Sequence, residues 1–249
     1  FYWRAHAHPR HNVIIFVADG LRSGMVSPET APTMAALRDE GVDFRNSHAM
    51  YPTVTTPNAS AIATGRRLGD TGDFGNNLYV GPEPLGESVI APMENDAVLG
   101  LMNPRYAGNF LAEDSLLAAA RANGFSTAAI GKLGPTSIQD VTERDGQGTI
   151  VIDDSTGMKA PDGIPLTPEI AAAIKAAGLP MTAPGRELNG DGGAYNRPGA
   201  RVANVEQQDW FAKVATEVVL PRFKAAGRPF VLVFWSRDPD GTQHNQGDS

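Results

Sequence analysis

The sequence predicts an α/β fold, built as a doubly wound and mostly parallel sheet with helices on both faces. Two runs of apolar residues, Val13–Ala18 and Phe230–Trp235, are typical of strands that are buried on both sides in a parallel sheet. Segments with helical signals alternate with the strand-like segments along the chain. With 249 residues, of which 41% are hydrophobic, the chain is long enough to bury a core.

The N-terminal part of the chain begins with the strand Val13–Ala18. This run stops at Asp19 and Gly20, which are typical of a turn, so Asp19 is expected at the C-terminal edge of the sheet. The segment Pro32–Gly41 has proline in its first turn and glycine just past its end, which predicts a short helix. Another strand is expected near Val42–Arg45.

The same pattern returns twice in the second half of the chain. A predicted helix in Ser115–Gly124 leads into a predicted strand at Thr127–Ile130. A longer predicted helix, Gln207–Ala226, leads into the apolar run Phe230–Trp235. This alternation predicts parallel strands joined by helical crossovers.

The chain divides into an N-terminal extension (residues 1–11) and a core (residues 12–249) with two predicted insertions, at 68–105 and 139–201. Both insertions are rich in Gly, Pro, Asn and Asp, and one amphipathic helix is expected near Pro168–Ala177. Loops of this length are uncommon unless they are functional. The insertions therefore form either a lid or cap over a substrate or an inert decoration of the core.

Composition restricts the partners and ligands. The formal net charge of −7 offers no general attraction for duplex nucleic acid, and the apolar runs are too short for a membrane span. The chain contains no cysteine, so a metal ion must be held by carboxylates, hydroxyls and imidazoles. The chain opens at Phe1 rather than at methionine, which favours a processed protein in the periplasm or outside the cell.

The segment Tyr51–Gly65 places hydroxyl groups at the start of a predicted helix. Pro57 suits the first turn and Gly65 suits the end, so Thr55 or Thr56 is expected at the N-cap. Free backbone N–H groups and the helix dipole favour an anion at that position, such as a phosphoryl group. The alternative is that one of the threonines only caps the helix.

Asp240 and His244 follow the strand Phe230–Trp235 closely. If this strand neighbours the first one, a carboxylate and an imidazole lie on a loop beside Asp19, where open parallel sheets form their sites. Taken singly, Asp19 has the alternative role of a turn residue and His244 that of a loop histidine. Together with the helix start at Thr55, they are interpreted as ligands.

The order of these motifs resembles the type I phosphodiesterase and nucleotide pyrophosphatase branch of the alkaline phosphatase superfamily. The motifs are a strand followed by Asp19-Gly20, then Pro52-Thr53-Val54-Thr55-Thr56-Pro57-Asn58 at a helix start, and Pro239-Asp240 with His244 after a late strand. The resemblance implies two zinc ions, a threonine nucleophile and a covalent phospho-enzyme intermediate. By position, Thr55 resembles the nucleophile, Asp19 a ligand of the zinc that also contacts Thr55, and Asp240 and His244 ligands of the other zinc.

The resemblance also implies two residues that contact the phosphoryl group. Asn76, preferred here over Asn77, matches an asparagine whose amide donates a hydrogen bond to the phosphoryl oxygen. Lys132 matches a lysine of the related monoesterases, in which an arginine follows two residues later; Gly134 stands at that position here. The alternative is that Lys132 is an ordinary lysine on a solvated loop.

The chain departs from the family pattern at its C-terminal end. No Asp-His dipeptide occurs, and His244 is the last histidine before the chain ends at Ser249. The remaining metal ligands are therefore expected on a C-terminal remainder of the same enzyme, which makes this chain incomplete and that segment its partner.

The sequence thus predicts metal-dependent hydrolysis of small-molecule phosphate esters through a phospho-threonine intermediate. Phosphodiesters or nucleotide pyrophosphates are the favoured substrates. The alternatives are a phosphomonoesterase of the same superfamily and a catalytically inactive metal-binding module with this fold. A sulfatase is disfavoured, because Thr55 and Asn58 do not provide the Cys/Ser-x-Pro-x-Arg pattern of that class.

Overall fold

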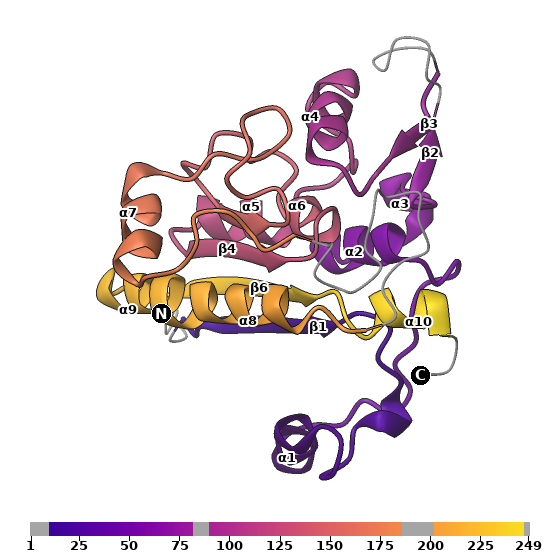
Figure 1. The fold of residues 1–249 in the computed structure, drawn as a ribbon. Helices are drawn as coiled ribbons and strands as arrows, with labels where there is room; N and C mark the ends of the chain where they lie inside the picture. Colours follow the sequence, from indigo (N-terminus) through magenta and orange to yellow (C-terminus); the bar gives the residue numbers. More distant parts are fainter. Residues whose placement is uncertain (1–9, 82–89, 186–201, 247–249) are drawn as a thin grey trace, which may run out of the picture.

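Four parallel strands form the central sheet of the computed structural model, which describes residues 10–81, 90–185 and 202–246 (Figure 1). In their order across the sheet, the strands are β1 (Val13–Ala18), β6 (Phe230–Ser236), β4 (Ser126–Gly131) and β5 (Ile150–Asp153). Each neighbouring pair is parallel. The sheet confirms the predicted fold class and all three strands predicted at the apolar runs of β1, β4 and β6.

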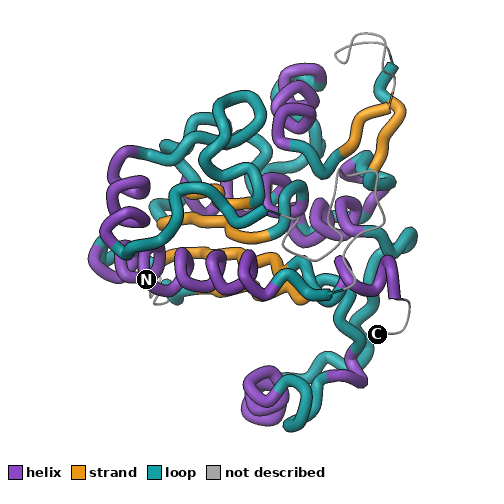
Figure 2. The backbone as a smooth tube through the Cα atoms, in the orientation of Figure 1, coloured by secondary structure: helices purple, strands orange, loops and turns teal. Residues whose placement is uncertain are grey.

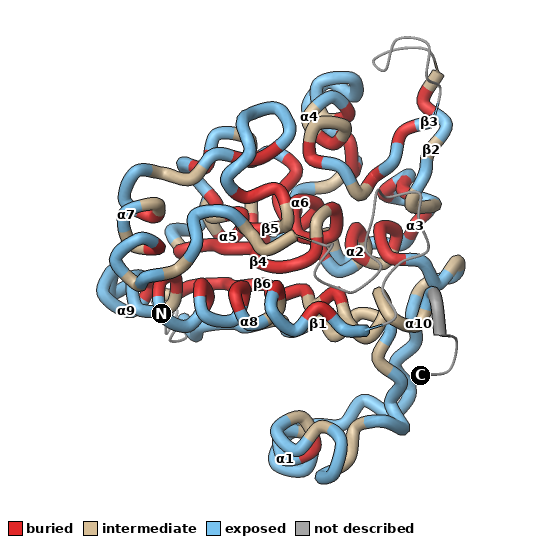
Figure 3. Tube along the Cα trace, in the orientation of Figure 1, coloured by how far each residue is buried: buried red, intermediate tan, exposed pale blue. Residues whose placement is uncertain are grey.

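Alternate residues of the central strands pack into clusters on opposite faces of the sheet, as the two-residue period of a strand requires. Ile130 of β4 and Leu232 of β6 join the cluster on one face, whereas Ala129 and Val233 join the cluster on the other. Figure 3 shows both central strands as buried along most of their length. Their unbroken apolar sequence therefore serves two faces at once.

Helices cover both faces of the sheet (Figure 2). One face carries α7 and a long helix in three parts: α7 (Pro168–Ala176), then α8 (Val205–Lys213), the π-helical η3 (Val214–Val219) and α9 (Leu220–Ala225). The opposite face carries three shorter helices: α2 (Thr55–Thr64), α5 (Leu116–Ala122) and α6 (Pro135–Ile138). The helices predicted in Ser115–Gly124, Gln207–Ala226 and near Pro168–Ala177 are confirmed.

The two predicted insertions join the core differently. The first contains four elements: α3 (Leu68–Thr71), the antiparallel pair β2 (Asn77–Tyr79) and β3 (Ile90–Pro92), and α4 (Asp96–Arg105). The second contributes β5 to the central sheet, in addition to α7. Residues 82–89 and 186–201 of these segments lie outside the described part of the chain. How far either segment acts as a lid stays a prediction.

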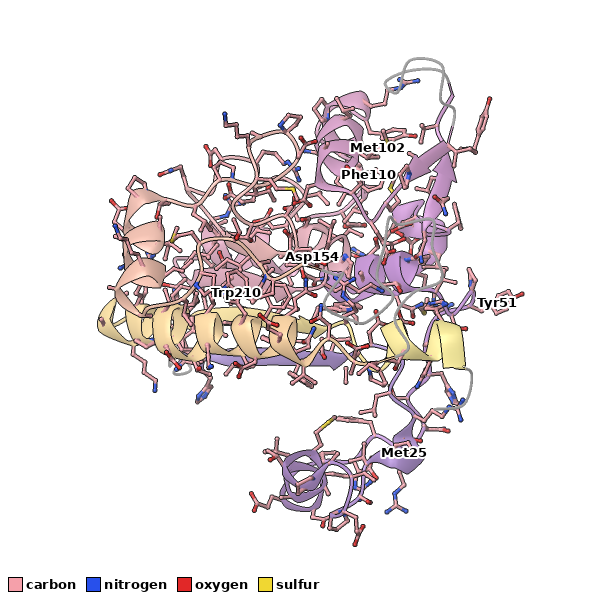
Figure 4. All side chains as sticks on the ribbon, in the orientation of Figure 1. Met25, Tyr51, Met102, Phe110, Asp154 and Trp210 are labelled. Atoms are coloured by element: carbon pink, nitrogen blue, oxygen red, sulfur yellow. The ribbon has the colours of Figure 1, made fainter. Side chains whose placement is uncertain are left out.

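The chain between β1 and α2 leaves the sheet as an arm (Figure 1). The arm contains the 3-10 helix η1 (Ser23–Met25) and α1 (Pro32–Glu40), and α1 confirms the helix predicted at Pro32. The strand predicted near Val42–Arg45 is wrong, because these residues pair with no described strand and form a loop. Val42 and Phe44 are both 77% exposed, and Tyr51 also points away from the core (Figure 4).

Within the described residues, no helix is long and apolar enough to cross a membrane. Of the predicted N-terminal extension, Arg10 and His11 are described and have no regular secondary structure. Residues 1–9 lie outside the described part.

Gly131 allows β4 to end against β6. Its φ is +133°, and a β-carbon added there would overlap the backbone oxygen of Trp235. We expect Gly131→Ala to lower the free energy of unfolding by more than about 3 kcal/mol, because it adds backbone strain to overlap between packed strands. Urea denaturation measures this loss.

Gly178→Ala is the matched control. Gly178 also has a positive φ, of +71°, but a β-carbon there would meet no atom within 4 Å. The control should therefore lose only about 1 kcal/mol. Equal losses in the two variants would contradict the overlap with Trp235.

Candidate active site

The C-terminal ends of the four parallel strands bring charged side chains to one edge of the sheet. Asp19 follows β1, Lys132 follows β4 and Asp154 follows β5. Asp240 follows β6 after a short turn, and its backbone N–H donates to the carbonyl oxygen of Asp19 at 2.9 Å. The predicted meeting of Asp19 with the residues after the last strand is therefore what β1–β6 pairing produces.

The ammonium group of Lys132 lies at the centre of this edge. Its Nζ atom is 3.0 Å from Asp19 Oδ2, 3.0 Å from Asp240 Oδ2 and 3.1 Å from Glu94 Oε1. It also donates a hydrogen bond to Thr55 Oγ1 at 3.2 Å. Lys132 is only 6% exposed, so it is not the solvated loop lysine of the alternative interpretation.

The buried charges shift one another's pKa values. Burial by itself lowers the pKa of Lys132, but the carboxylates of Glu94, Asp19 and Asp240 outweigh it, so that this pKa is raised and the ammonium stays charged. Burial also raises the pKa of Asp19, against the opposing effect of Lys132. Asp19 Oδ2 additionally accepts a hydrogen bond from Trp235 Nε1 at 3.1 Å. Lys132 therefore partly neutralises a cluster that is rich in negative charge.

Thr55 is the first residue of α2 and not the N-cap that precedes the helix. The N-cap is Val54, which has extended backbone angles and makes no side-chain cap hydrogen bond of its own. Thr55 and Thr56 are the first two helical residues because Pro57 fits the first turn and Val54 does not continue the helix. The prediction that Thr55 or Thr56 is the N-cap is wrong, but the Thr55 hydroxyl still lies at the helix N-terminus.

Asn76 is held against the start of α2. Its Oδ1 atom accepts a hydrogen bond from the backbone N–H of Thr56 at 2.9 Å, which leaves the amide nitrogen as the end of the side chain that can donate. Asn76 lines the same cavity as Thr55, whereas Asn77 lines a different one. The two asparagines therefore face different parts of the surface.

A buried carboxylate lies beneath this contact. Asp73 accepts hydrogen bonds from Ser60 Oγ at 2.6 Å and from Thr56 Oγ1 at 3.5 Å, and Thr56 Oγ1 also donates to the backbone oxygen of Gly75 at 3.1 Å. Burial is the main cause that raises the pKa of Asp73 to about 6. Sequence reasoning missed this residue, because nothing in the local pattern shows that its loop packs against α2.

Asp240 and His244 lie on a short helix, α10 (Asp240–Gln246), and not on the predicted loop. Asp240 is its first residue, and one helical turn brings His244 back to it, with Nε2 3.3 Å from Asp240 Oδ1. The His244 side chain is 72% exposed. The helix therefore places the imidazole at the outer side of the carboxylate pair.

One open cavity of about 710 Å³ lies at the end of the sheet, and it is lined by Asp19, Thr55, Asn76, Asp240 and His244. Its polar wall includes Asp19, Thr55 and Asn76. Its apolar wall includes Val54 and Ile62. A cavity with both kinds of wall suits an anionic group that carries an apolar substituent.

Three oxygen atoms around the Lys132 ammonium belong to side chains that can also bind a metal ion. Asp19 and Asp240 each place one carboxylate oxygen 3.0 Å from the ammonium, and the Thr55 hydroxyl lies 3.2 Å from it. Carboxylate, hydroxyl and the nearby imidazole of His244 are donors that zinc accepts. However, among residues 10–81, 90–185 and 202–246 no group of three or more His, Cys, Asp or Glu side chains is placed to hold a metal ion. The described donors thus fit part of a metal site and do not complete two.

Glu94 and Trp235 are further site residues that sequence reasoning missed. Glu94 comes from the segment interpreted as an insertion, and it reaches Lys132 only through the packing of β3 beside α2. Trp235 belongs to a strand whose apolar sequence predicts only burial. No local sequence signal identifies either residue, because both act through long-range contacts.

Comparison with known protein families gives a match over most of the chain. The model of the family described as type I phosphodiesterase / nucleotide pyrophosphatase matches residues 13–249. The searches of curated proteins and of solved structures found no match.

The raised pKa of Asp73 predicts a pH-dependent loss of stability. Between about pH 4 and pH 6, the unfolded chain releases this proton while the folded protein retains it. The contribution of Asp73 to stability should therefore fall as the pH rises from about 4 to about 6, by about 1.4 kcal/mol per pH unit and about 3 kcal/mol in total, and should not change further above pH 6. Asp73→Asn should lack this loss when the free energy of unfolding is measured against pH.

Asp140→Asn is the matched control. Asp140 is equally buried and accepts hydrogen bonds from Arg121, Thr142 and Thr149, away from α2. This variant should keep the wild-type decrease between pH 4 and pH 6. Parallel pH profiles for the wild type and Asp73→Asn would contradict the assignment.

Proposed function

The chain belongs to the type I phosphodiesterase / nucleotide pyrophosphatase family, and on that premise we propose that it hydrolyses phosphate esters through a covalent intermediate on Thr55. The family makes the protein a hydrolase of the phosphodiesterase and pyrophosphatase type. The nucleophile, the metal dependence and the preferred substrate are our proposals.

One observation carries the proposal for Thr55. Its hydroxyl lies at the N-terminus of a ten-residue helix, 3.2 Å from a buried ammonium, in a cavity at the C-terminal edge of a parallel sheet. The helix start and the ammonium both favour a phosphoryl group bound against that hydroxyl. A threonine that only capped its helix would not need the charge of Lys132 beside it.

The proposed reaction has two displacements at phosphorus. Thr55 Oγ releases its proton to water and attacks, so that an Oγ–P bond forms while the bond from phosphorus to the leaving oxygen breaks; the leaving group departs with that electron pair and takes up a proton from water. A water molecule then attacks the phospho-threonine, the Oγ–P bond breaks, and the hydroxyl of Thr55 is restored. In both steps Lys132 and the amide nitrogen of Asn76 donate hydrogen bonds to the non-bridging oxygens, where negative charge increases.

We also propose two zinc ions as cofactors. Asp19 and Thr55 would hold one ion, and Asp240 and His244 the other, with the remaining ligands on a further segment of the same enzyme. When bound, such an ion lowers the pKa of the threonine hydroxyl and offsets charge on the phosphoryl group. The donor types around Lys132 support this assignment.

The surface of β1 supports a further segment beside this chain. Ile14 and Phe16 are 56% and 53% exposed, although β1 is a strand of a parallel sheet, and such strands are normally covered on both faces. This exposed strand leads directly to the site, because Asp19 follows β1.

We propose that phosphodiesters or nucleotide pyrophosphates are preferred over monoesters. A monoester dianion needs more cationic donors than a diester does. Lys132 supplies one such donor, and three carboxylates already surround it. The second candidate function is a phosphomonoesterase, which the ammonium beside Thr55 favours.

Thr55→Ala tests the nucleophile. We expect turnover by the full-length enzyme to fall at least about a thousandfold, with no phosphoryl label retained on the protein, because no other described hydroxyl contacts Lys132. Thr64→Ala removes the same group at the far end of α2, where its hydroxyl donates to Ser60 O, and should stay active. Loss of labelling in Thr56→Ala with retention in Thr55→Ala would move the nucleophile by one residue.

The substrate preference is tested by kcat/KM for bis-p-nitrophenyl phosphate and for p-nitrophenyl phosphate on the full-length enzyme. We expect the diester value to be the larger one. A monoester advantage of about a hundredfold, some 2.7 kcal/mol of transition-state binding, would reverse the assignment in favour of the phosphomonoesterase.

A further inference from the structure

The carboxylate of Glu94 has one described polar contact, the ion pair with Lys132. Its Oε1 atom lies 3.1 Å from Lys132 Nζ, and this atom has no hydrogen-bond partner among the described residues. The side chain is 31% exposed. Its carboxylate therefore acts mainly on the charge beside Thr55.

The backbone on both sides of Glu94 is fixed. The N–H of Met93 donates to the backbone oxygen of Asn76 at 2.8 Å, and the Met93 side chain is fully buried in the cluster that contains α2. On the other side, Asn95 caps α4 by accepting a hydrogen bond from the backbone N–H of Val98 at 3.0 Å. The carboxylate is thus carried into the site by a rigid part of the chain.

The loop after Lys132 packs directly against Glu94. Gly134 has φ of +93°, and a β-carbon added there would lie 2.6 Å from the Cα atom of Glu94. A side chain at position 134 has no room to bring a second positive charge to this side of the site. On the side of Gly134, the charged neighbour of the Lys132 ammonium is therefore the Glu94 carboxylate.

We propose that Glu94 is a specificity-determining residue that disfavours substrates whose phosphoryl group carries two negative charges. A phosphoryl group held against Thr55 lies close to Lys132, and therefore also close to the carboxylate paired with that ammonium. The repulsion grows with the charge of the substrate, so it acts more strongly on a monoester dianion than on a diester monoanion.

This inference rests on the proposed function for the choice of substrates, and it extends that function by naming the residue that selects. The test is Glu94→Gln in the full-length enzyme, because glutamine keeps the size and the acceptor but removes the charge. We expect kcat/KM for p-nitrophenyl phosphate to rise about tenfold and that for bis-p-nitrophenyl phosphate to change by less than about threefold.

Glu113→Gln is the matched control. Glu113 is a similarly exposed glutamate, at 36%, and it pairs with Arg66 at 3.2 Å outside the cavity. This variant should leave both values of kcat/KM unchanged. Equal changes for the two substrates in Glu94→Gln would show that Glu94 only positions Lys132, and would overturn the proposal. No change for either substrate would overturn it as well.

Binding of inorganic phosphate separates this proposal from the proposed function. Calorimetry needs no turnover, and phosphate changes from monoanion to dianion within the accessible pH range. Glu94→Gln should tighten phosphate binding about tenfold at pH 8.5 and much less at pH 5.5. That result would support the role of Glu94 even if neither ester were hydrolysed, whereas an equal gain at both pH values would contradict discrimination by charge.

Discussion

An ammonium group that is taken out of water must recover through charge pairing and hydrogen bonds what it loses in hydration. Lys132 does so by contacting residues from four other parts of the chain: the end of β1, the start of α2, the segment after β3 and the start of α10. Removing the ammonium would leave its carboxylate partners close together in a partly buried place, where their repulsion is poorly screened. The positions of these elements at the site therefore depend on one side chain, which is also the group in contact with the Thr55 hydroxyl.

A second set of contacts fixes the other side of Thr55 without using Lys132. Asn76 binds the backbone N–H of Thr56, and Asp73 accepts hydrogen bonds from Thr56 and Ser60 on successive turns of α2. The ammonium thus determines the charge at the hydroxyl, whereas the loop around Asp73 determines the position of the helix start. Because the two sets of contacts are separate, charge and geometry at the nucleophile can be altered independently.

The sequence predicts those features that are encoded locally. The strands at Val13–Ala18 and Phe230–Trp235, and the helix that starts near Thr55, follow from patterns within a few residues, and the structure contains all three. The strand predicted near Val42–Arg45 fails because a strand also needs a neighbour, and the arm provides none among the described residues. The predicted N-cap, Thr55 or Thr56, is wrong because a proline in the first turn of a helix is compatible with more than one N-cap position, and Val54 is the N-cap in the structure.

The site itself could be predicted only in part, for the same reason. Asp19 and Asp240 follow from the rule that strand ends meet at one edge of a parallel sheet, and Thr55 follows from the pattern of a helix start. The contact of Glu94 with Lys132, however, spans distant segments that no local pattern connects. Sequence reasoning could propose a role for Lys132, yet it could not distinguish a solvated lysine from a buried one. The side chain is 6% exposed, a property of the folded sheet that the residues around position 132 do not show.

The balance of charge connects the metal proposal with the substrate proposal. Three carboxylates, Asp19, Asp240 and Glu94, face one ammonium, so the described site has a formal excess of negative charge, and the raised pKa of Asp19 includes the repulsion from Asp240. An anionic phosphate ester approaching Thr55 would meet net repulsion there, within a protein whose overall formal charge is −7. Additional positive charge would strengthen the binding of such a substrate, and metal ions held by Asp19 and Asp240 would supply it. The part of this excess that comes from Glu94 lies beyond that pair and would remain, so the filled site would still favour the substrate with the smaller negative charge.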